Sequence, residues 1–365
     1  MTLGIIYSFI SAVLLGLYAL PSKYTKNYAW ENTWGGFFFF GMIVIPLITT
    51  FTLVDNLTGI YSEIPSWIFF AMFAMSFCWG IGNMMWGFSI SSIGMSLAFS
   101  LFLGVITSID TILPLILVPE GQESVIGTPV GNIMLFGIFV IVLGIALNGY
   151  AGVLRDKSKK TDGSLSVDSK TMKKGILLCV FGAICAAGFN LSYHVGNNIG
   201  KIGEVAQVQY GNEPWIARLA VLLPIFMGGA LSTMVYFSYT LTKRKTWGNY
   251  TGKGALKGLM LIALMAIFHD AALVIYGLGA YNLGELGTSV GFAILETGAI
   301  MIANVNGILT KEWKGASKKS ITVLVISLSI LILGVLIIAN GNYIKIQDDA
   351  VSLLLSIFFK DGLIC

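Results

Sequence analysis

Three carboxyl side chains lie inside apolar stretches of this sequence that are long enough to cross a bilayer. They are Asp110, Asp270 and Glu296. An ionised side chain at the centre of a spanning helix costs about 2.5–3.5 kcal/mol on insertion scales, so three of them facing lipid would cost about 8–10 kcal/mol. Each must therefore be protonated, paired or hydrated. The functional interpretation is a carboxyl that takes up and releases a proton, and the structural one is a carboxyl that joins two helices by hydrogen bonds.

Two histidines lie in similar stretches. His269 directly precedes Asp270, and because neighbours in sequence point to different sides of a helix, we do not expect them to form a dyad. His194 follows Asn190 near the end of its apolar run, as either a ligand group or an interfacial histidine. The sequence has no HExxH motif and no cysteine pair at metal spacing, and neither histidine fits a nucleophilic triad. We therefore predict neither a metal site nor an enzyme.

An aromatic and amide face is the second candidate for chemistry. Trp79 and Asn83 are four residues apart and Trp86 is three further on, so the three share one helix face. Ring faces beside amide groups suit a sugar, because its C–H faces pack on rings while its hydroxyls form hydrogen bonds. The alternative is tryptophan in the interfacial belt and an asparagine that bonds a neighbouring helix. Further candidates for substrate binding are polar residues of other spans, Asn190, His194, His269 and Asn304.

Composition identifies the elements that must position these residues. The chain is 56% hydrophobic and only 11% charged, whereas a soluble domain has about 25% charged residues. An all-α polytopic membrane protein follows. The hydropathy criterion of about 19 residues predicts ten spans, near residues 3–20, 34–54, 67–91, 94–118, 130–152, 175–197, 215–242, 257–281, 286–309 and 319–340. The absence of a GxxxxGK[ST] loop excludes an ATP-driven pump, and the absence of a basic stripe excludes nucleic-acid binding.

The basic residues predict the orientation of the chain. Of the 22 lysines and arginines, 18 lie in the loops after the first, fifth, seventh and ninth spans. Because basic loops stay on the cytoplasmic side, we expect a multi-pass protein of the cytoplasmic (inner) membrane with both termini outside.

The spans divide into two sets of five around a basic segment. Since five is odd, the two halves cross the membrane in opposite senses, which is the inverted repeat of secondary transporters. Glycines support this register: Gly94 follows Trp86-Gly87 as Gly284 follows Tyr276-Gly277, and Gly4 and Gly175 each begin a half. The register aligns Ile106 with Glu296 and Thr107 with Thr297. The expected units are residues 1–152, the first repeat; 153–174, a cytoplasmic linker; 175–342, the second repeat; and 343–365, an interfacial or disordered tail.

Four short motifs carry a resemblance to a known family. They are Trp79-Gly80-Ile81-Gly82-Asn83, Gly94-Met95-Ser96, Lys173-Lys174-Gly175 and Lys311-Glu312-Trp313. With the ten-span plan, they make the chain resemble the drug/metabolite transporter superfamily and, within it, the L-rhamnose–proton symporters. The resemblance implies proton-coupled import of a deoxy sugar, with L-rhamnose as the expected substrate, and carries over only Trp79 and Asn83 as pocket residues. The implied partners are the sugar, protons and the bilayer, with no cofactor.

The sequence also departs from that family. The family pattern has a histidine one residue before the position of Glu296, where this chain has Leu295, and an aromatic-rich eighth span where this chain has His269 and Asp270. The coupling role of Glu296 therefore rests on burial alone. We expect its protonation, with that of Asp270, to permit alternating access. The alternatives are an exporter or carrier of another small polar metabolite, a membrane-embedded enzyme, and a non-transporting receptor.

Overall fold

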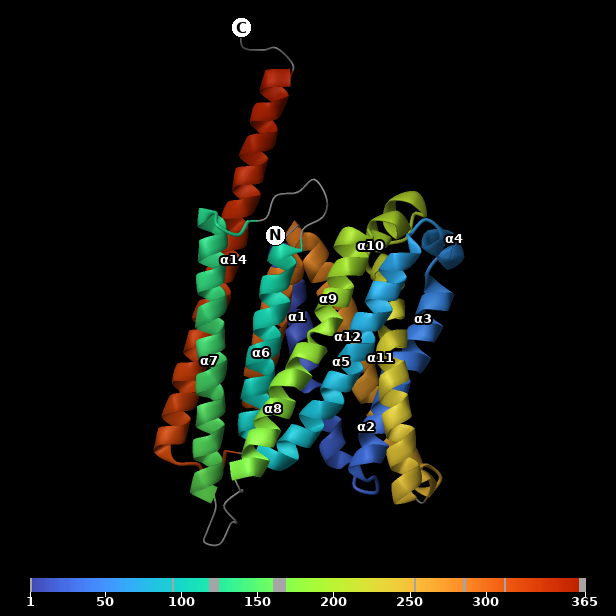
Figure 1. Ribbon diagram of the computed structural model, residues 1–365, viewed down its shortest axis with the longest axis vertical. Helices are drawn as coiled ribbons and strands as arrows, with labels where there is room; N and C mark the ends of the chain where they lie inside the picture. The colour runs from blue at the N-terminus through green and yellow to red at the C-terminus, as the bar shows by residue number, and fades with distance from the viewer. Residues whose placement is uncertain are drawn as a thin grey trace.

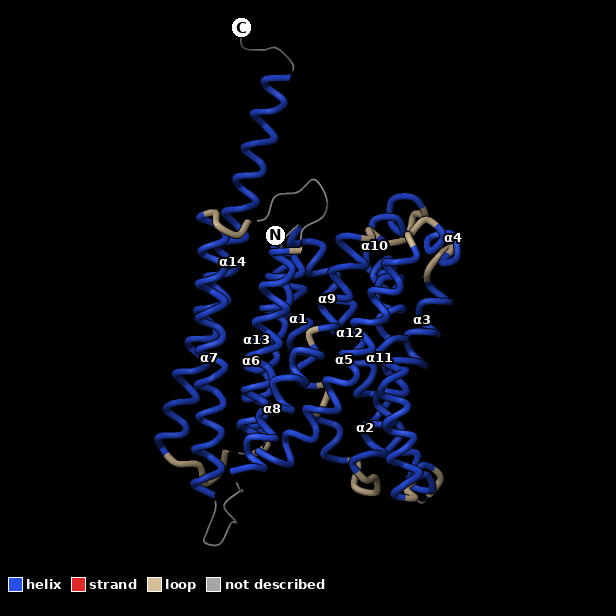
Figure 2. Tube along the Cα trace, viewed as in Figure 1, coloured by secondary structure: helices blue, strands red, loops and turns tan. Residues whose placement is uncertain are grey.

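A computed structural model describes residues 2–93, 95–117, 125–159, 169–252, 254–284, 287–311 and 313–360. Within these ranges every regular element is a helix (Figure 2). This agrees with the expected all-α class, because backbone groups inside a bilayer are satisfied within a helix.

The described residues form ten long helical segments at the places where spans are expected. They are α1 (Thr2–Leu17), α2 with α3 (Trp30–Phe39, Ile45–Leu53), α5 (Ser66–Ile93), α6 (Met95–Ile116), α7 (Pro129–Lys159), α8 with α9 (Ser169–Ala186, Gly188–His194), α11 (Pro214–Arg244), α12 (Ala255–Leu283), α13 (Gly287–Leu309) and α14 (Lys318–Lys360). Nine are long and apolar enough to span a membrane, and α6 has a shorter apolar run, Leu101–Ile116. Its 22 residues still rise about 33 Å, enough to cross.

The second and sixth spans contain π-helical turns. One turn, Phe40–Val44, separates α2 from α3, and the other, Val195–Ile199, follows α9. The first has a local cause, since Pro46 lacks an N–H and its ring would collide with the carbonyl of Met42 in a regular helix. The wider turn relieves that collision. It also places Gly41 beside α12, which matters for the site described below.

The helix ends form two faces of the molecule. In Figure 1, α1 begins and α14 ends on one side, which we call the termini end. The ends of α7 and α11, at Lys159 and Arg244, lie on the opposite side, which we call the basic end. Two short helices, α4 (Leu57–Ser62) and α10 (Ile202–Glu204), lie at the termini end.

Two of the expected units extend beyond the described residues. In the linker expected at residues 153–174, α7 continues to Lys159 and α8 begins at Ser169, and residues 160–168 lie outside the description. The expected tail begins inside α14, which continues as one helix to Lys360 beyond the other helices (Figure 1). Residues 361–365 lie outside the described part, so an interfacial tail stays a prediction.

The packing of the helices is exchanged between the two halves. The first helix of the first half, α1, packs against α12 and α13 of the second half. The first helix of the second half, α8, packs against α5 and α6 of the first half. The glycine contacts repeat as well: a Cβ at Gly4 would lie 2.7 Å from Leu283, and one at Gly175 would lie 2.6 Å from Ile93. Leu283 and Ile93 each precede one of the glycines that set the register, of which Gly94 lies outside the described residues. This exchange is compatible with the inverted repeat, which stays a prediction.

Candidate functional site

The fourth span of each half contributes polar side chains to the middle of the molecule. From α6 come Thr107 and Asp110, which are 1% and 0% exposed, and from α13 come Thr297, which is 0% exposed, and Glu296, which is partly exposed. Both oxygens of the Asp110 carboxyl and both threonine hydroxyls have no hydrogen-bond partner among the described residues. The carboxyls of Asp110 and Glu296 are close enough to interact electrostatically. These four residues form what we call the carboxyl centre.

Asp110 in this position is disfavoured as an isolated ionised group. An ionised carboxylate that is buried without a donor loses several kcal/mol of hydration, and nothing in the described chain donates to it. Glu296 differs because its side chain reaches accessible space. The centre therefore combines one sequestered carboxyl with one that can exchange protons.

Asn190 holds the elements around the carboxyl centre. Its Nδ2 donates to the carbonyl oxygens of Asp110 at 2.9 Å and Thr288 at 3.3 Å, while the Tyr276 hydroxyl donates to its Oδ1. One buried amide thus links α9 to α6, α12 and α13. Tyr276 also interacts electrostatically with Asp110 and Glu296. With its amide already bonded, Asn190 positions the centre in this conformation.

His194 makes a similar link nearer the termini end. Its Nε2 lies 2.5 Å from the Leu117 carbonyl oxygen and its Nδ1 lies 2.9 Å from the Thr288 hydroxyl. A carbonyl only accepts, so Nε2 carries the proton, and the hydroxyl donates to Nδ1 in the neutral ring. The side chain is 2% exposed. In this conformation both ring nitrogens of His194 bond protein groups.

His269 and Asp270 are in contact, so the expectation that they form no dyad is wrong. Nδ1 of His269 lies 3.1 Å from Oδ1 of Asp270. The expectation used the directions in which neighbouring side chains leave a helix, but rotation about the side-chain bonds brings these polar ends together. The other carboxyl oxygen, Oδ2, has no described partner. The π turn packs beside this carboxyl, where a Cβ at Gly41 would be 3.4 Å from Oδ1 of Asp270.

An aromatic cluster connects this pair with Glu296. The Tyr18 ring lies 5.5 Å from His269, 5.4 Å from Phe37 and 6.3 Å from Trp34, measured between centroids. Tyr18 also interacts electrostatically with Glu296. Tyr18 and Trp34 are partly exposed, so ring faces, an imidazole and a carboxyl share one region. Sequence reasoning missed both rings because they lie at the ends of their spans.

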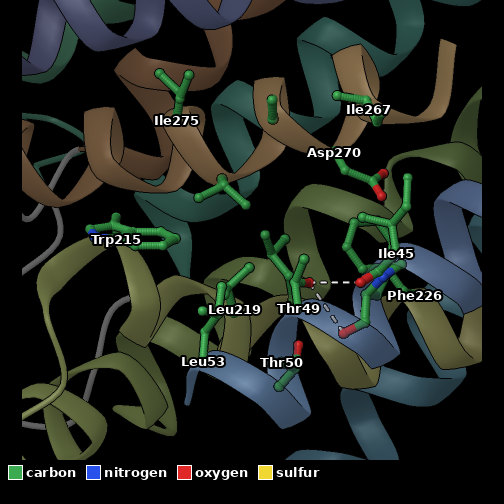
Figure 3. Close-up of a pocket in the computed structure, with 14 residues that line it drawn as sticks. Ile45, Thr49, Thr50, Leu53, Trp215, Leu219, Phe226, Ile267, Asp270 and Ile275 are labelled. Carbon is green, nitrogen blue, oxygen red and sulfur yellow. Dashed lines mark hydrogen bonds between the residues drawn. The ribbon is translucent and has the colours of Figure 1, made fainter. Parts of the chain in front are cut away.

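A cavity of about 400 Å³ opens between α3, α11 and α12. Figure 3 shows Asp270 at its edge, with Leu53, Trp215 and Leu219 among the lining residues. Asp270 is the only ionisable side chain of the lining, and the Thr49 hydroxyl is bonded to the Ile45 carbonyl at 2.8 Å. A lining this apolar does not suit a sugar, whose hydroxyls need partners.

The remaining candidates from the sequence contact other parts of the protein, as follows. Trp79 is 8% exposed, with its ring 5.1 Å from Phe189. Trp86 stacks on Phe102 at 5.1 Å, and Asn83 is partly exposed on the same helix. The Nδ2 of Asn304 donates to the Ile300 carbonyl of its own helix at 2.8 Å. Their roles in substrate binding stay predictions, and no cluster of metal-binding side chains occurs in the described part of the chain.

Comparison with known proteins identifies the family. Residues 1–343 match the family described as L-rhamnose-proton symport protein (RhaT). A relative named L-rhamnose-proton symporter, from Pectobacterium atrosepticum, is 27% identical over 345 residues, covering 93% of this chain and 97% of its own. Relatives of the same name from Yersinia pestis and Yersinia pseudotuberculosis are 24% identical over 348 residues, with the same coverage. Since the match spans almost the whole sequence, this multi-pass membrane protein belongs to the L-rhamnose-proton symport protein family.

Proposed function

We propose that this protein imports L-rhamnose together with a proton across the cytoplasmic membrane by alternating access. The family match and the names of the relatives support the substrate and the coupling ion. The observation that carries the proposal in this chain is the carboxyl centre, in which Asp110 and Glu296 interact electrostatically on equivalent spans of the two halves. A site between inverted repeats stays in place while the halves rock around it.

Glu296 is the group that exchanges the proton. Two carboxylates at close range repel each other in a medium of low dielectric constant, so the pair holds at least one proton. Asp110 is sequestered, whereas Glu296 reaches accessible space. A proton on Glu296 neutralises the centre and removes the cost of moving a charge through an occluded state. Reorientation then requires the proton.

The sugar is bound at the aromatic cluster beside Glu296. The partly exposed rings of Tyr18 and Trp34 offer faces for the C–H surface of a pyranose. The His269 imidazole packs on Tyr18 and the Glu296 carboxyl interacts electrostatically with it, so both can supply polar partners. A sugar placed here neighbours the proton site, which explains how one ligand changes the energy of the other. Trp79 and Asn83 remain the pocket candidates that the family resemblance implies.

The basic end faces the cytoplasm in this proposal. Support comes from the basic residues that flank the helix ends there, including Lys243, Arg244 and Lys245 at the end of α11. Both termini are then outside, and residues 1–152 and 175–342 form the two repeats.

Uptake of labelled L-rhamnose into proteoliposomes with an imposed pH gradient tests the proposal. Wild type accumulates the sugar only when the gradient is present. Glu296→Gln still exchanges sugar across the membrane but no longer concentrates it. The control is Glu204→Gln, which removes an exposed carboxyl 3.5 Å from Lys201 at the surface and leaves accumulation unchanged. If wild type ignores rhamnose, the substrate is wrong; if Glu296→Gln accumulates sugar normally, the coupling residue is wrong.

A further inference from the structure

Arg218 is a buried cation without a carboxylate partner. It lies in the second turn of α11 at the termini end, is 1% exposed and is among the largest fully buried side chains of the described chain. Its Nη1 donates to Asn197 Oδ1 at 2.7 Å, its Nε donates to the Pro214 carbonyl at 3.1 Å, and its plane lies 4.8 Å from the centroid of the Tyr281 ring. Nη2 has no described partner, and no described carboxylate lies within ion-pair distance.

The fold makes room for this guanidinium. A Cβ at Gly203 would lie 2.7 Å from its central carbon, and a Cβ at Gly277 would lie 3.1 Å from Cγ of Arg218. Two glycines from α10 and α12 therefore admit the side chain. Burying an arginine without a counter-charge is unfavourable compared with an apolar side chain of similar volume, so a purely packing role does not explain the charge.

A line of hydroxyl and amide groups leads from Arg218 to the carboxyl centre. Tyr193 neighbours Arg218, since a Cβ at Gly277 would lie 2.6 Å from the Tyr193 hydroxyl and 3.1 Å from Cγ of Arg218, and the two side chains interact electrostatically. The Tyr193 and Tyr276 rings are 5.4 Å apart. Tyr276 in turn bonds Asn190 and interacts electrostatically with Asp110 and Glu296. Groups of this kind are what a proton needs to move between the termini end and the carboxyls.

We propose that Arg218 is an electrostatic barrier that keeps protons at the termini end from reaching the carboxyl centre while the path is closed. A fixed positive charge in a medium of low dielectric constant repels a second one, as charged barriers do in selective pores. The other titratable groups that face the guanidinium are Tyr193 and Tyr281, and Glu204 on α10 is turned to the surface beside Lys201. This barrier rests on the proton site of the proposed function. It would limit uncoupled proton leak.

Proton flux without sugar tests the barrier. Full-length protein is placed in proteoliposomes that contain a pH-sensitive dye, and an imposed pH gradient is followed in the absence of rhamnose. We expect Arg218→Gln to dissipate the gradient about tenfold faster than wild type, the change that about 1.4 kcal/mol of barrier produces. Arg218→Lys keeps the charge and stays near wild type. The control Lys201→Gln, an exposed cation at the same end, changes nothing.

Two outcomes overturn the proposal: a folded Arg218→Gln that leaks no faster than wild type, or an Arg218→Lys that leaks as fast as Arg218→Gln. Should Arg218→Gln fail to give a monodisperse protein, Arg218→Met takes its place, since it removes the charge and fills the site with an apolar side chain of similar length. We expect the same faster leak, and a folded Arg218→Met that leaks no faster than wild type contradicts the barrier.

The route is tested separately from the proposed function. In the double variant Arg218→Gln with Glu296→Gln, the leak disappears if protons pass through the carboxyl centre, and a leak that persists overturns the route. A wild type that shows no rhamnose-driven proton flux would refute the proposed symport. The sugar-free comparison of wild type with the Arg218 variants would still decide the barrier.

Discussion

Ring pairs occupy equivalent places in the two halves of this protein. In the first half Trp86 packs on Phe102 with centroids 5.1 Å apart, and in the second half Tyr276 packs on Phe292 at 6.0 Å. The register that aligns Thr107 with Thr297 also aligns these two pairs. Thr107 and Thr297 are themselves both buried with unbonded hydroxyls. These matched contacts are what the proposed inverted repeat predicts.

The chemistry at the repeated positions is not the same. Trp79 packs on Phe189 at 5.1 Å, and the equivalent contact in the second half is His269 on Tyr18 at 5.5 Å. Likewise Gly80 corresponds to Asp270 and Ile106 to Glu296. The second half thus has a titratable group where the first has an apolar one. The exception is Asp110, whose counterpart is Ile300.

This difference separates two requirements of a symporter. Equivalent packing gives the halves two conformations that they can exchange at similar energy, which alternating access needs. A proton site, by contrast, is needed only once, because a second independent site could bind protons without a fixed ratio to the sugar. Apolar packing in the first half and titratable groups in the second, with Asp110 as the exception, meet both requirements.

The largest expected effect comes from removing the carboxyl that the first half contributes to the carboxyl centre. Asp110→Asn keeps the shape of the neutral acid, so the fold and sugar exchange persist. A one-proton symporter concentrates its sugar about tenfold for each pH unit of gradient, the free energy of one pH unit for one proton. If Asp110 and Glu296 share the coupled proton, that accumulation falls to none in uptake assays.

The control for Asp110→Asn is a change at the equivalent position of the other half. Ile300→Val removes one methylene from a residue that is 7% exposed, at a cost of about 0.5–1.5 kcal/mol. Sugar accumulation should not change. Undiminished accumulation in Asp110→Asn would show that Glu296 acts alone and that the centre is not a pair.

Removing the ring from the first half should mainly lower stability. Trp79→Ala loses the contact with Phe189 and leaves a void beside Gly229, since a Cβ at Gly229 would lie 2.7 Å from the Trp79 ring. Such truncations cost about 3–5 kcal/mol. Thermal unfolding in detergent measures the loss. A normal melting temperature with a strongly raised KM for rhamnose would instead place Trp79 in the sugar site.

Much of this arrangement could be read from the sequence. The ten spans follow from hydropathy because apolar stretches of about 20 residues satisfy their backbone groups in lipid as helices. The register followed from Gly4, Gly175 and Gly284, since close helix contacts require small residues at fixed places. Glu296 was selected as a candidate because a carboxyl in an apolar run needs an explanation, and its role stays a prediction.

The contacts that the sequence did not indicate depend on which helices pack against each other. Tyr18 and Trp34 come from the ends of two different spans and gain their significance only beside His269. Trp79 has the residue type of a sugar-binding surface, but the glycine of another helix encloses its ring. The His269–Asp270 contact depends on side-chain rotation, which a helical wheel does not describe.

The equivalent ring of the second half should respond differently. His269→Phe keeps a ring against Tyr18 and Phe37 but removes the nitrogen that bonds Asp270. Leaving a buried acceptor without its partner costs about 1–3 kcal/mol. We also expect a higher KM for rhamnose, because the imidazole lies in the proposed sugar site. If the variant loses stability but its KM for rhamnose does not change, the His269–Asp270 pair has only a structural role. The two halves would then differ less in function than we propose.

The smallest expected effects compare one glycine from each half. A Cβ at Gly229 would lie 2.7 Å from the Trp79 ring, so Gly229→Ala overpacks the first-half contact and costs about 1–3 kcal/mol. A Cβ at Gly41 would meet Asp270 Oδ1 at 3.4 Å, an ordinary contact, so Gly41→Ala should shift the melting temperature only slightly. The reason is that a carboxylate occupies less space than an indole. If the two variants were destabilised equally, the Gly41–Asp270 contact would be packed as tightly as the Gly229–Trp79 contact. The polar groups of the second half would then occur in packing as dense as that of the first half.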